Sequence, residues 1–203
     1  MKYKILLEQL KNLPYFTKNT IFQIAEQYKL KNSTIDTYIA RALKHKIIIS
    51  LKNGLYIYTD FYNNNIGDIS YSFYLANIMR QPSYISSWTA LQYYNLTTET
   101  IYAIISATPK ITHAYRTKAG NFCYQTIKKE LFSNFVSVEA KFSFLIATPS
   151  KALFDLLYFK TKQFRGMKIK DIRDLIEEMR IDFDEISRVE QDNFFSIIKK
   201  YVN

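Results

Sequence analysis

The sequence contains very little cysteine, glycine or histidine, and each scarcity excludes a class of site. Its single cysteine, Cys123, can form neither an internal disulfide nor a cysteine-built metal site. Four glycines leave no glycine-rich phosphate-binding loop. The two histidines, His45 and His113, lie far apart and lack metal-ligand spacing. We therefore expect no metal, no cofactor and no catalytic site.

Long apolar runs are also missing. A membrane-spanning helix needs about 20 consecutive apolar residues, and no stretch of that kind occurs. The N-terminus continues into an amphipathic helical pattern instead of an apolar signal-peptide core. We therefore expect a cytoplasmic protein with no membrane partner.

Positive charge, by contrast, is abundant and unevenly distributed. The 203 residues carry a formal net charge of +10. Residues 1–60 contain 10 Lys/Arg against 4 Asp/Glu, and residues 61–165 contain 11 against 5. Residues 166–203 contain 7 against 9. An excess of this size favours a polyanionic partner, and it places the basic surface in the first two thirds of the chain.

The first sixty residues have the pattern of three helices followed by two strands. Pro14 ends the first helix, and Thr17 is a good N-cap for the second. Ser33 and Asp36 approximate a capping box at the start of the third. Asn53-Gly54 is a strong hairpin signal between the strands. This order predicts a winged helix-turn-helix whose elements cover residues 2–12, 17–28, 33–45, 47–51 and 55–59.

The third helix has the composition of a recognition helix. Apolar residues from Ile35 to Leu43 cluster on one side at helical spacing. The opposite side carries hydroxyl and basic side chains that suit phosphates and base edges. A solvated helix face used only for protein contact remains the alternative. The residues that we predict to bind DNA are Lys18, Thr34, Thr37, Arg41, Lys44, Lys52 and Asn53, with Lys29, Lys31 and Lys46 as further phosphate contacts.

The remainder of the chain mixes strand and helix patterns. The polar stretch Asp60–Gly67 is the best linker candidate, so we predict domains at residues 1–62 and 66–203. The fold class predicted is α+β: an N-terminal winged helix-turn-helix, then a mixed α/β domain with a small sheet and C-terminal helices. Expected helices cover 68–79, 84–95 and 148–159 and two later segments; expected strands cover 101–106, 112–117, 121–127 and 142–146.

Patterns that could support catalysis are weak. Glu139-Ala140-Lys141 has the E-x-K form of metal-dependent nucleases, but the only nearby upstream carboxylate, Glu130, does not lie in a strand-like segment. Asp155 sits among apolar helix residues, and Lys151 four residues earlier can pair with it. A structural ion pair and a role in the function of the second domain both remain open for these two residues.

Several ordered segments resemble the AbiEi family of antitoxins. Residues 82–91 (PSYISSWTAL) are similar to its P-S-Y-[VI]-S-x-x-[ST]-A-L segment, and residues 120–127 (GNFCYQTI) to its G-x-[FY]-x-Y-x-x-I hairpin. Residues 146–158 (IATPSKALFDLLY) resemble its I-A-T-P-E-K-A-L-x-D-x-x-Y helix, and residues 51–56 resemble its wing. One departure is Ser150, which stands where the family usually has Glu.

The resemblance implies an N-terminal winged helix that binds double-stranded operator DNA and represses its own operon. It also implies a C-terminal domain that counters a cognate nucleotidyltransferase-like toxin in abortive infection, without a stable complex. Lys151 and Asp155 match the family helix and are the candidates for antitoxin function. Two rival hypotheses stay open: a stand-alone regulator whose second domain binds a ligand or partner, and a metal-dependent nuclease of a defence system.

Overall fold

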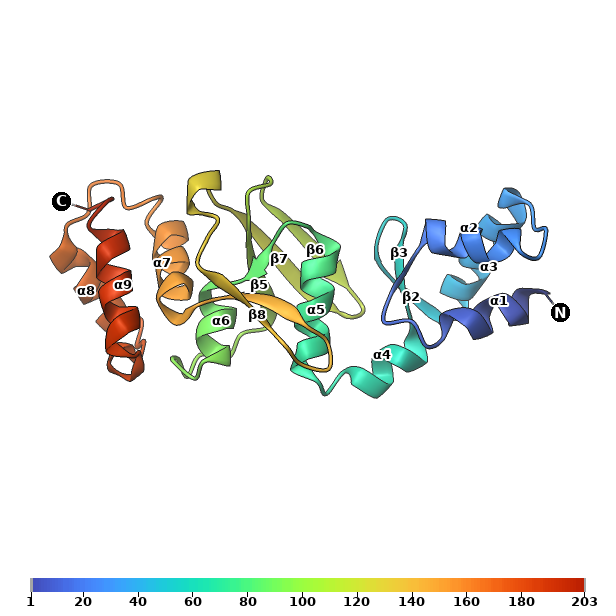
Figure 1. Cartoon of the computed structure of the whole chain (residues 1–203), viewed down its shortest axis with the longest axis horizontal. Helices are drawn as coiled ribbons and strands as arrows, with labels where there is room; N and C mark the ends of the chain where they lie inside the picture. Colours follow the sequence, from blue (N-terminus) through green and yellow to red (C-terminus); the bar gives the residue numbers. More distant parts are fainter. Residues whose placement is uncertain (1, 203) are drawn as a thin grey trace.

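The computed structural model describes residues 2–202 and shows a mixed α/β protein. The described residues form nine α-helices and two sheets, of three and six strands. Figure 1 shows an elongated arrangement, with α1–α3 at one end, the larger sheet in the middle, and α8 and α9 at the other end. The longest of these helices has 13 residues, so none within the described part could cross a bilayer.

Three helices and a small antiparallel sheet form the N-terminal unit, residues 2–58. The sheet has the strand order β1-β3-β2. Buried Ile35, Ile39 and Ala42 confirm the predicted inner face of α3. The elements are α1 (Lys2–Leu10), β1 (Phe16–Thr17), α2 (Lys18–Glu26), α3 (Asn32–Lys44), β2 (Ile48–Lys52) and β3 (Leu55–Tyr58).

Two helix starts differ in how well the sequence predicted them. Thr17 caps α2 as expected: its Oγ1 accepts from the N–H of Thr20, while the Thr20 side chain accepts from the N–H of Thr17. The capping box predicted at Ser33 is wrong, because α3 begins one residue earlier, after Lys31, with no side-chain cap. Asp36 instead pairs with Lys18 of α2, with 2.7 Å between Nζ and Oδ1.

The stretch predicted to be a linker, residues 60–67, is largely helical. Helix α4 (Thr59–Asn65) follows β3 directly. Its Tyr62 and Asn65, three residues apart, share a face and are buried. The Asn65 side chain accepts a hydrogen bond of 2.7 Å from Lys141 Nζ. The contacts of this polar segment with the rest of the chain could not be predicted from a local apolar pattern.

The second unit, residues 69–202, is built on a six-stranded mixed sheet of order β6-β7-β5-β4-β9-β8. β4 pairs parallel with β9 and β5 with β7, and the other pairs are antiparallel. Its first elements are α5 (Ile69–Met79), β4 (Tyr84–Ile85), α6 (Ser87–Tyr93), β5 (Ala103–Thr108), β6 (His113–Thr117), β7 (Gly120–Thr126), β8 (Phe135–Val138) and β9 (Phe144–Ala147).

The helix predicted over 84–95 is in fact a strand followed by a helix. Ser86 is extended and Ser87 has a φ of 56°, so the chain turns sharply between β4 and α6. Strand β8 was not predicted. It forms the edge of a sheet that is larger than expected, paired with β9 from Phe135↔Ala147 to Val138↔Phe144.

Three helices complete the second unit: α7 (Pro149–Lys160), α8 (Ile169–Glu178) and α9 (Arg188–Ile198). Helix α7 packs against both α6 and α9, and its residues from Ser150 to Tyr158 are all buried. Such complete burial is unusual for a helix that carries both a lysine and an aspartate.

The β2–β3 hairpin connects the two hydrophobic cores. Ile48 and Tyr56 pack with α1–α3, whereas Ile49, Leu51 and Ile57 belong to the core of the second unit. Further contacts tie the units together, including a 2.7 Å hydrogen bond from the Tyr71 hydroxyl to the carbonyl of Pro14. Both faces of the hairpin are therefore covered.

Candidate functional site

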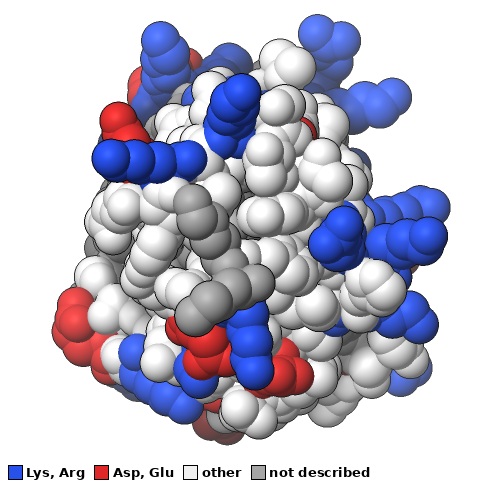
Figure 2. All heavy atoms as spheres, turned by 90° about the vertical axis from the view of Figure 1, so that its right-hand side faces the viewer, with Lys and Arg blue, Asp and Glu red and all other residues white. Residues whose placement is uncertain are grey.

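The outward face of α3 is open to solvent. Thr37, Arg41 and Lys44 are exposed, and Thr34 is half-buried. Lys44 has no ion-pair partner within residues 2–202. Figure 2 looks onto the end of the molecule that carries α1–α3 and shows lysines and arginines along its upper and right-hand margins, with acidic residues mainly below. The predicted face thus lies on a predominantly basic end.

Two of these side chains are already oriented by neighbours. The Thr37 hydroxyl donates to the carbonyl of Ser33, at 3.0 Å. The Arg41 guanidinium lies 5.8 Å from the centre of the Tyr3 ring, a cation–π contact that leaves the polar edge of the guanidinium accessible. Burial raises the pKa of Tyr3, and the charge of Arg41 opposes that shift. Arg41 is therefore held by α1 in a defined direction.

Lys18 is less free than the sequence suggested. It is the first residue of α2, its ammonium is paired with Asp36, and it lies 5.3 Å from the centre of the Phe22 ring. Both partners of the pair are about half exposed, so the pair contributes little to stability. A phosphate could compete for Lys18 at small cost.

Of the two residues at the tip of the β2–β3 hairpin that we predicted to bind DNA, Asn53 and Lys52, only one faces solvent freely. Gly54 has the positive φ that the Asn-Gly turn predicts, 73°, and its carbonyl accepts from the N–H of Lys18 at 2.9 Å. Asn53 is exposed. Lys52, however, turns inward and donates to the carbonyl of Met79 at the end of α5, at 2.7 Å. The structure thus uses Lys52 to join the hairpin to the second unit.

The second pair of candidates, Lys151 and Asp155, forms a fully buried polar cluster. Their side chains are 2% and 0% exposed, with 2.7 Å between Nζ and Oδ1. The other carboxylate oxygen of Asp155 accepts from the hydroxyls of Tyr84, at 2.9 Å, and Ser86, at 2.7 Å. The Lys151 ammonium also lies 4.8 Å from the centre of the Phe154 ring. Neither side chain is accessible to a partner in this structure.

The electrostatics of this cluster follow from its burial. Burial raises the pKa of the Asp155 carboxyl, while the Lys151 ammonium and the two hydroxyl donors oppose the shift. Burial also raises the pKa of the Tyr84 hydroxyl, so it remains a donor. The sequence did not indicate Tyr84 and Ser86 as partners, although both lie in the PSYIS segment.

Helix α7 begins with an unexpected carboxylate from elsewhere in the chain. Glu190 of α9 accepts from the backbone N–H of Ser150, at 2.9 Å. Ser150 is in the first turn of α7, where a negative charge is favourable. Burial raises the pKa of Glu190, but hydrogen bonds from Ser150 and its neighbours outweigh this and hold the pKa below its usual value. Glu190 thus supplies a carboxylate to the first turn of α7, the turn in which the family motif has Glu at the position of Ser150.

The nuclease pattern is not assembled into a common site. Glu139 accepts hydrogen bonds from the hydroxyls of Ser137 and Ser143, whereas Lys141 donates to Asn65. Among the described residues, no group of three or more His, Cys, Asp or Glu side chains is arranged to hold a metal ion.

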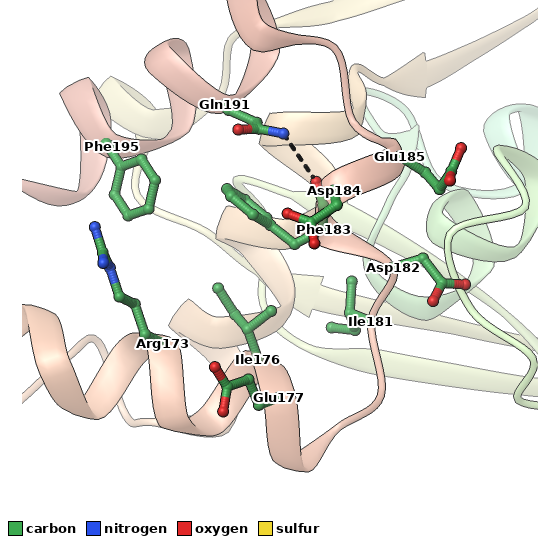
Figure 3. Close-up of a pocket in the computed structure, with 10 residues that line it drawn as sticks. All are labelled: Arg173, Ile176, Glu177, Ile181, Asp182, Phe183, Asp184, Glu185, Gln191 and Phe195. Carbon is green, nitrogen blue, oxygen red and sulfur yellow. Dashed lines mark hydrogen bonds between the residues drawn. The ribbon is translucent and has the colours of Figure 1, made fainter.

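A cavity of about 650 Å³ lies among α8, α9 and the loop between them (Figure 3). Its floor is apolar, with Ile176 and Phe183. Arg173 at one wall lies 5.3 Å from the centre of the Phe195 ring. The carboxylates at its rim belong to Glu177, Asp182, Asp184 and Glu185, so this cavity does not suit an anionic ligand.

No model of a known protein family matches this chain, and no curated protein matches its sequence. The motif resemblance therefore stays a prediction. The structure gives its residues a physical role nonetheless: Tyr84 and Ser86 of the first motif segment meet Lys151 and Asp155 of the helical one.

Proposed function

We propose that this chain is a DNA-binding transcriptional autorepressor and antitoxin of the AbiEi type, in which residues 2–58 act as a winged helix-turn-helix. The observation that carries the DNA-binding half is the exposed face of α3. It presents Thr37, Arg41 and Lys44 outward from a helix whose other side is buried, at a basic end of the molecule. An arginine so placed can contact a guanine edge with two hydrogen bonds.

The contact surface differs from the one that the sequence predicted. We assign base contacts to Arg41, with phosphate contacts from Lys44, Lys18 and the exposed Asn53 of the wing tip. Lys52 is left out, because its ammonium is used in the bond to Met79. The wing acts mainly as a strut between the two units, and recognition rests on α3.

A gel-shift titration with DNA from upstream of the chain's own reading frame tests this assignment. Arg41→Ala is expected to weaken binding to the upstream DNA by about 1–3 kcal/mol, and to weaken binding to random DNA by less. Lys44→Ala is expected to weaken both and to lower the salt dependence, since it removes one phosphate contact. Equal affinities of Arg41→Ala and the unmodified chain would refute the recognition role of α3.

For the antitoxin half, the support is the motif resemblance, two of whose segments contact one another through the buried cluster around Asp155. The proposal is that the second unit counters a nucleotidyltransferase-like toxin encoded alongside, without forming a stable complex. Co-expression with the product of the adjacent reading frame tests this proposal. Growth rescue by the full chain supports it, and the absence of any toxic neighbour favours the stand-alone regulator.

A further inference from the structure

All of the chain's net charge can be traced to two segments that contain no acidic residue. Residues 100–129 contain five Lys/Arg and no Asp/Glu, and residues 156–170 again contain five and none. The remaining residues are balanced, with 18 basic and 18 acidic side chains. The first segment includes β5–β7, and the second runs from the second half of α7 through the following turn into the start of α8.

These two segments face one another across a cavity of about 300 Å³. Its walls come from the residue before β6 and the end of β7 on one side, and from the end of α7 with the following turn on the other. The lining is polar and aromatic and contains no carboxylate. The lining residues are Thr112, Gln125, Thr126, Tyr158, Phe159, Lys162 and Gln163.

The turn after α7 is held in an unusual backbone conformation. Lys162, Gln163 and Phe164 have φ values of 50°, 71° and 60°, three consecutive non-glycine residues in the left-handed region. Such strain persists only where surrounding structure enforces it. Here Phe164 is buried, with its ring 5.3 Å from that of Phe154, and its N–H donates to Thr161 Oγ1 at 2.9 Å. This anchor leaves Lys162 and Gln163 exposed at the cavity.

Gln125, one of the lining residues, has a polar atom without a partner. Gln125 Oε1 is buried and has no hydrogen-bond partner among the described residues. The neighbouring hydroxyls are occupied: Thr126 donates to the carbonyl of Lys110 at 2.9 Å and lies 3.0 Å from Thr112. A buried polar group without a partner calls for explanation, and a ligand that supplies a donor is one.

We propose that this cavity binds a phosphorylated nucleotide. Lys162 supplies the ammonium for a phosphate, and the half-buried Phe159 ring provides a face on which a base can stack. The amides of Gln125 and Gln163 offer donors and acceptors to the edge of the base. Lys160 is left out of the site, since it lies in the last turn of α7, where it complements the helix dipole.

Calorimetric titration of the full chain with ATP, pyrophosphate and an eight-nucleotide single strand tests this inference at physiological salt. Lys162→Ala and Gln125→Glu are each expected to weaken ATP binding at least tenfold. Phe159→Ala should weaken ATP and spare pyrophosphate. Lys199→Ala, which removes an equal charge from an exposed side chain just after α9, should match the unmodified chain. Thermal unfolding of each variant without ligand checks that it is folded.

The outcomes separate the sources of the ligand. If ATP binds and the variants change its affinity as expected above, the ligand is a free nucleotide. If the single strand binds more tightly than ATP and the variants change its affinity in the same way, the ligand is a nucleic-acid chain. The inference would be overturned if none of the three probes bound saturably, or if Lys162→Ala and Lys199→Ala changed ATP binding equally. Because the cavity does not include α3, loss of operator binding by Arg41→Ala with intact ATP binding would separate this site from the proposed DNA contact.

Discussion

Replacing Lys151 with methionine tests the buried cluster most directly. The change keeps the length of the side chain and removes the ammonium, which leaves the Asp155 carboxylate in the core with only the hydroxyls of Tyr84 and Ser86. Removing one partner of a buried ion pair costs about 3–5 kcal/mol. Proteins of this kind are stable by about 5–15 kcal/mol, so the variant should lose a large share of its stability.

Urea unfolding followed by the fluorescence of Trp88 measures this loss. Trp88 is the only tryptophan and lies in α6, two residues from Ser86, so it reports on the second unit. With a slope of about 2 kcal/mol per M, a loss of about 3 kcal/mol moves the midpoint by about 1.5 M. An unchanged midpoint in Lys151→Met would refute the reasoning.

A double-mutant cycle separates the pair from other effects. Asp155→Asn leaves the Lys151 ammonium unpaired and should cost about as much as Lys151→Met. The double variant should be less destabilised than the sum of the two single variants, because it contains no unpaired buried charge. Toxin rescue should fall only in step with stability. Loss of rescue with an unchanged unfolding curve would instead give the pair a direct functional role.

Three further changes probe the start of α7 and the contact between the two units. Glu190→Gln should destabilise the chain by about 1 kcal/mol at neutral pH, because it weakens the charged cap on Ser150. The pKa of Glu190 is lowered in the folded state, so its contribution is present above the unfolded value of about 4.3 and is lost as the pH falls through the folded pKa. The unfolding curves of the variant and the unmodified chain should therefore differ at pH 7 and approach one another as the pH is lowered. Lys52→Met should lower stability by about 1 kcal/mol and leave operator affinity within twofold in a gel shift, because it breaks the bond to Met79 and no DNA contact; a tenfold loss of affinity would restore Lys52 to the interface. A fragment of residues 1–62 should be poorly folded by circular dichroism, because it exposes the hairpin face that includes Ile57; a fragment that unfolds cooperatively and binds the operator as tightly as the full chain would show that the units are independent.

Short-range features of the sequence predicted much of the N-terminal unit. The spacing of Ile35, Ile39 and Ala42 identified the buried side of α3, and Thr17 and Gly54 marked a helix start and a turn correctly. These features depend on residues within one or two turns of each other, so periodicity and capping rules suffice to find them. The division of charge is likewise visible without any coordinates.

Contacts between distant segments were decided only by the tertiary structure. An i, i+4 pair of lysine and aspartate looks the same on a solvated helix as on one enclosed by α6 and α9, so the depth of Lys151 and Asp155 was hidden. Lys52 similarly resembled any wing-tip lysine until α5 placed the carbonyl of Met79 beside it. The chemical groups of a side chain can be read from the sequence. Its burial and its hydrogen-bond or ion-pair partners depend on which distant segments the fold packs against it, and these determine which role the residue has.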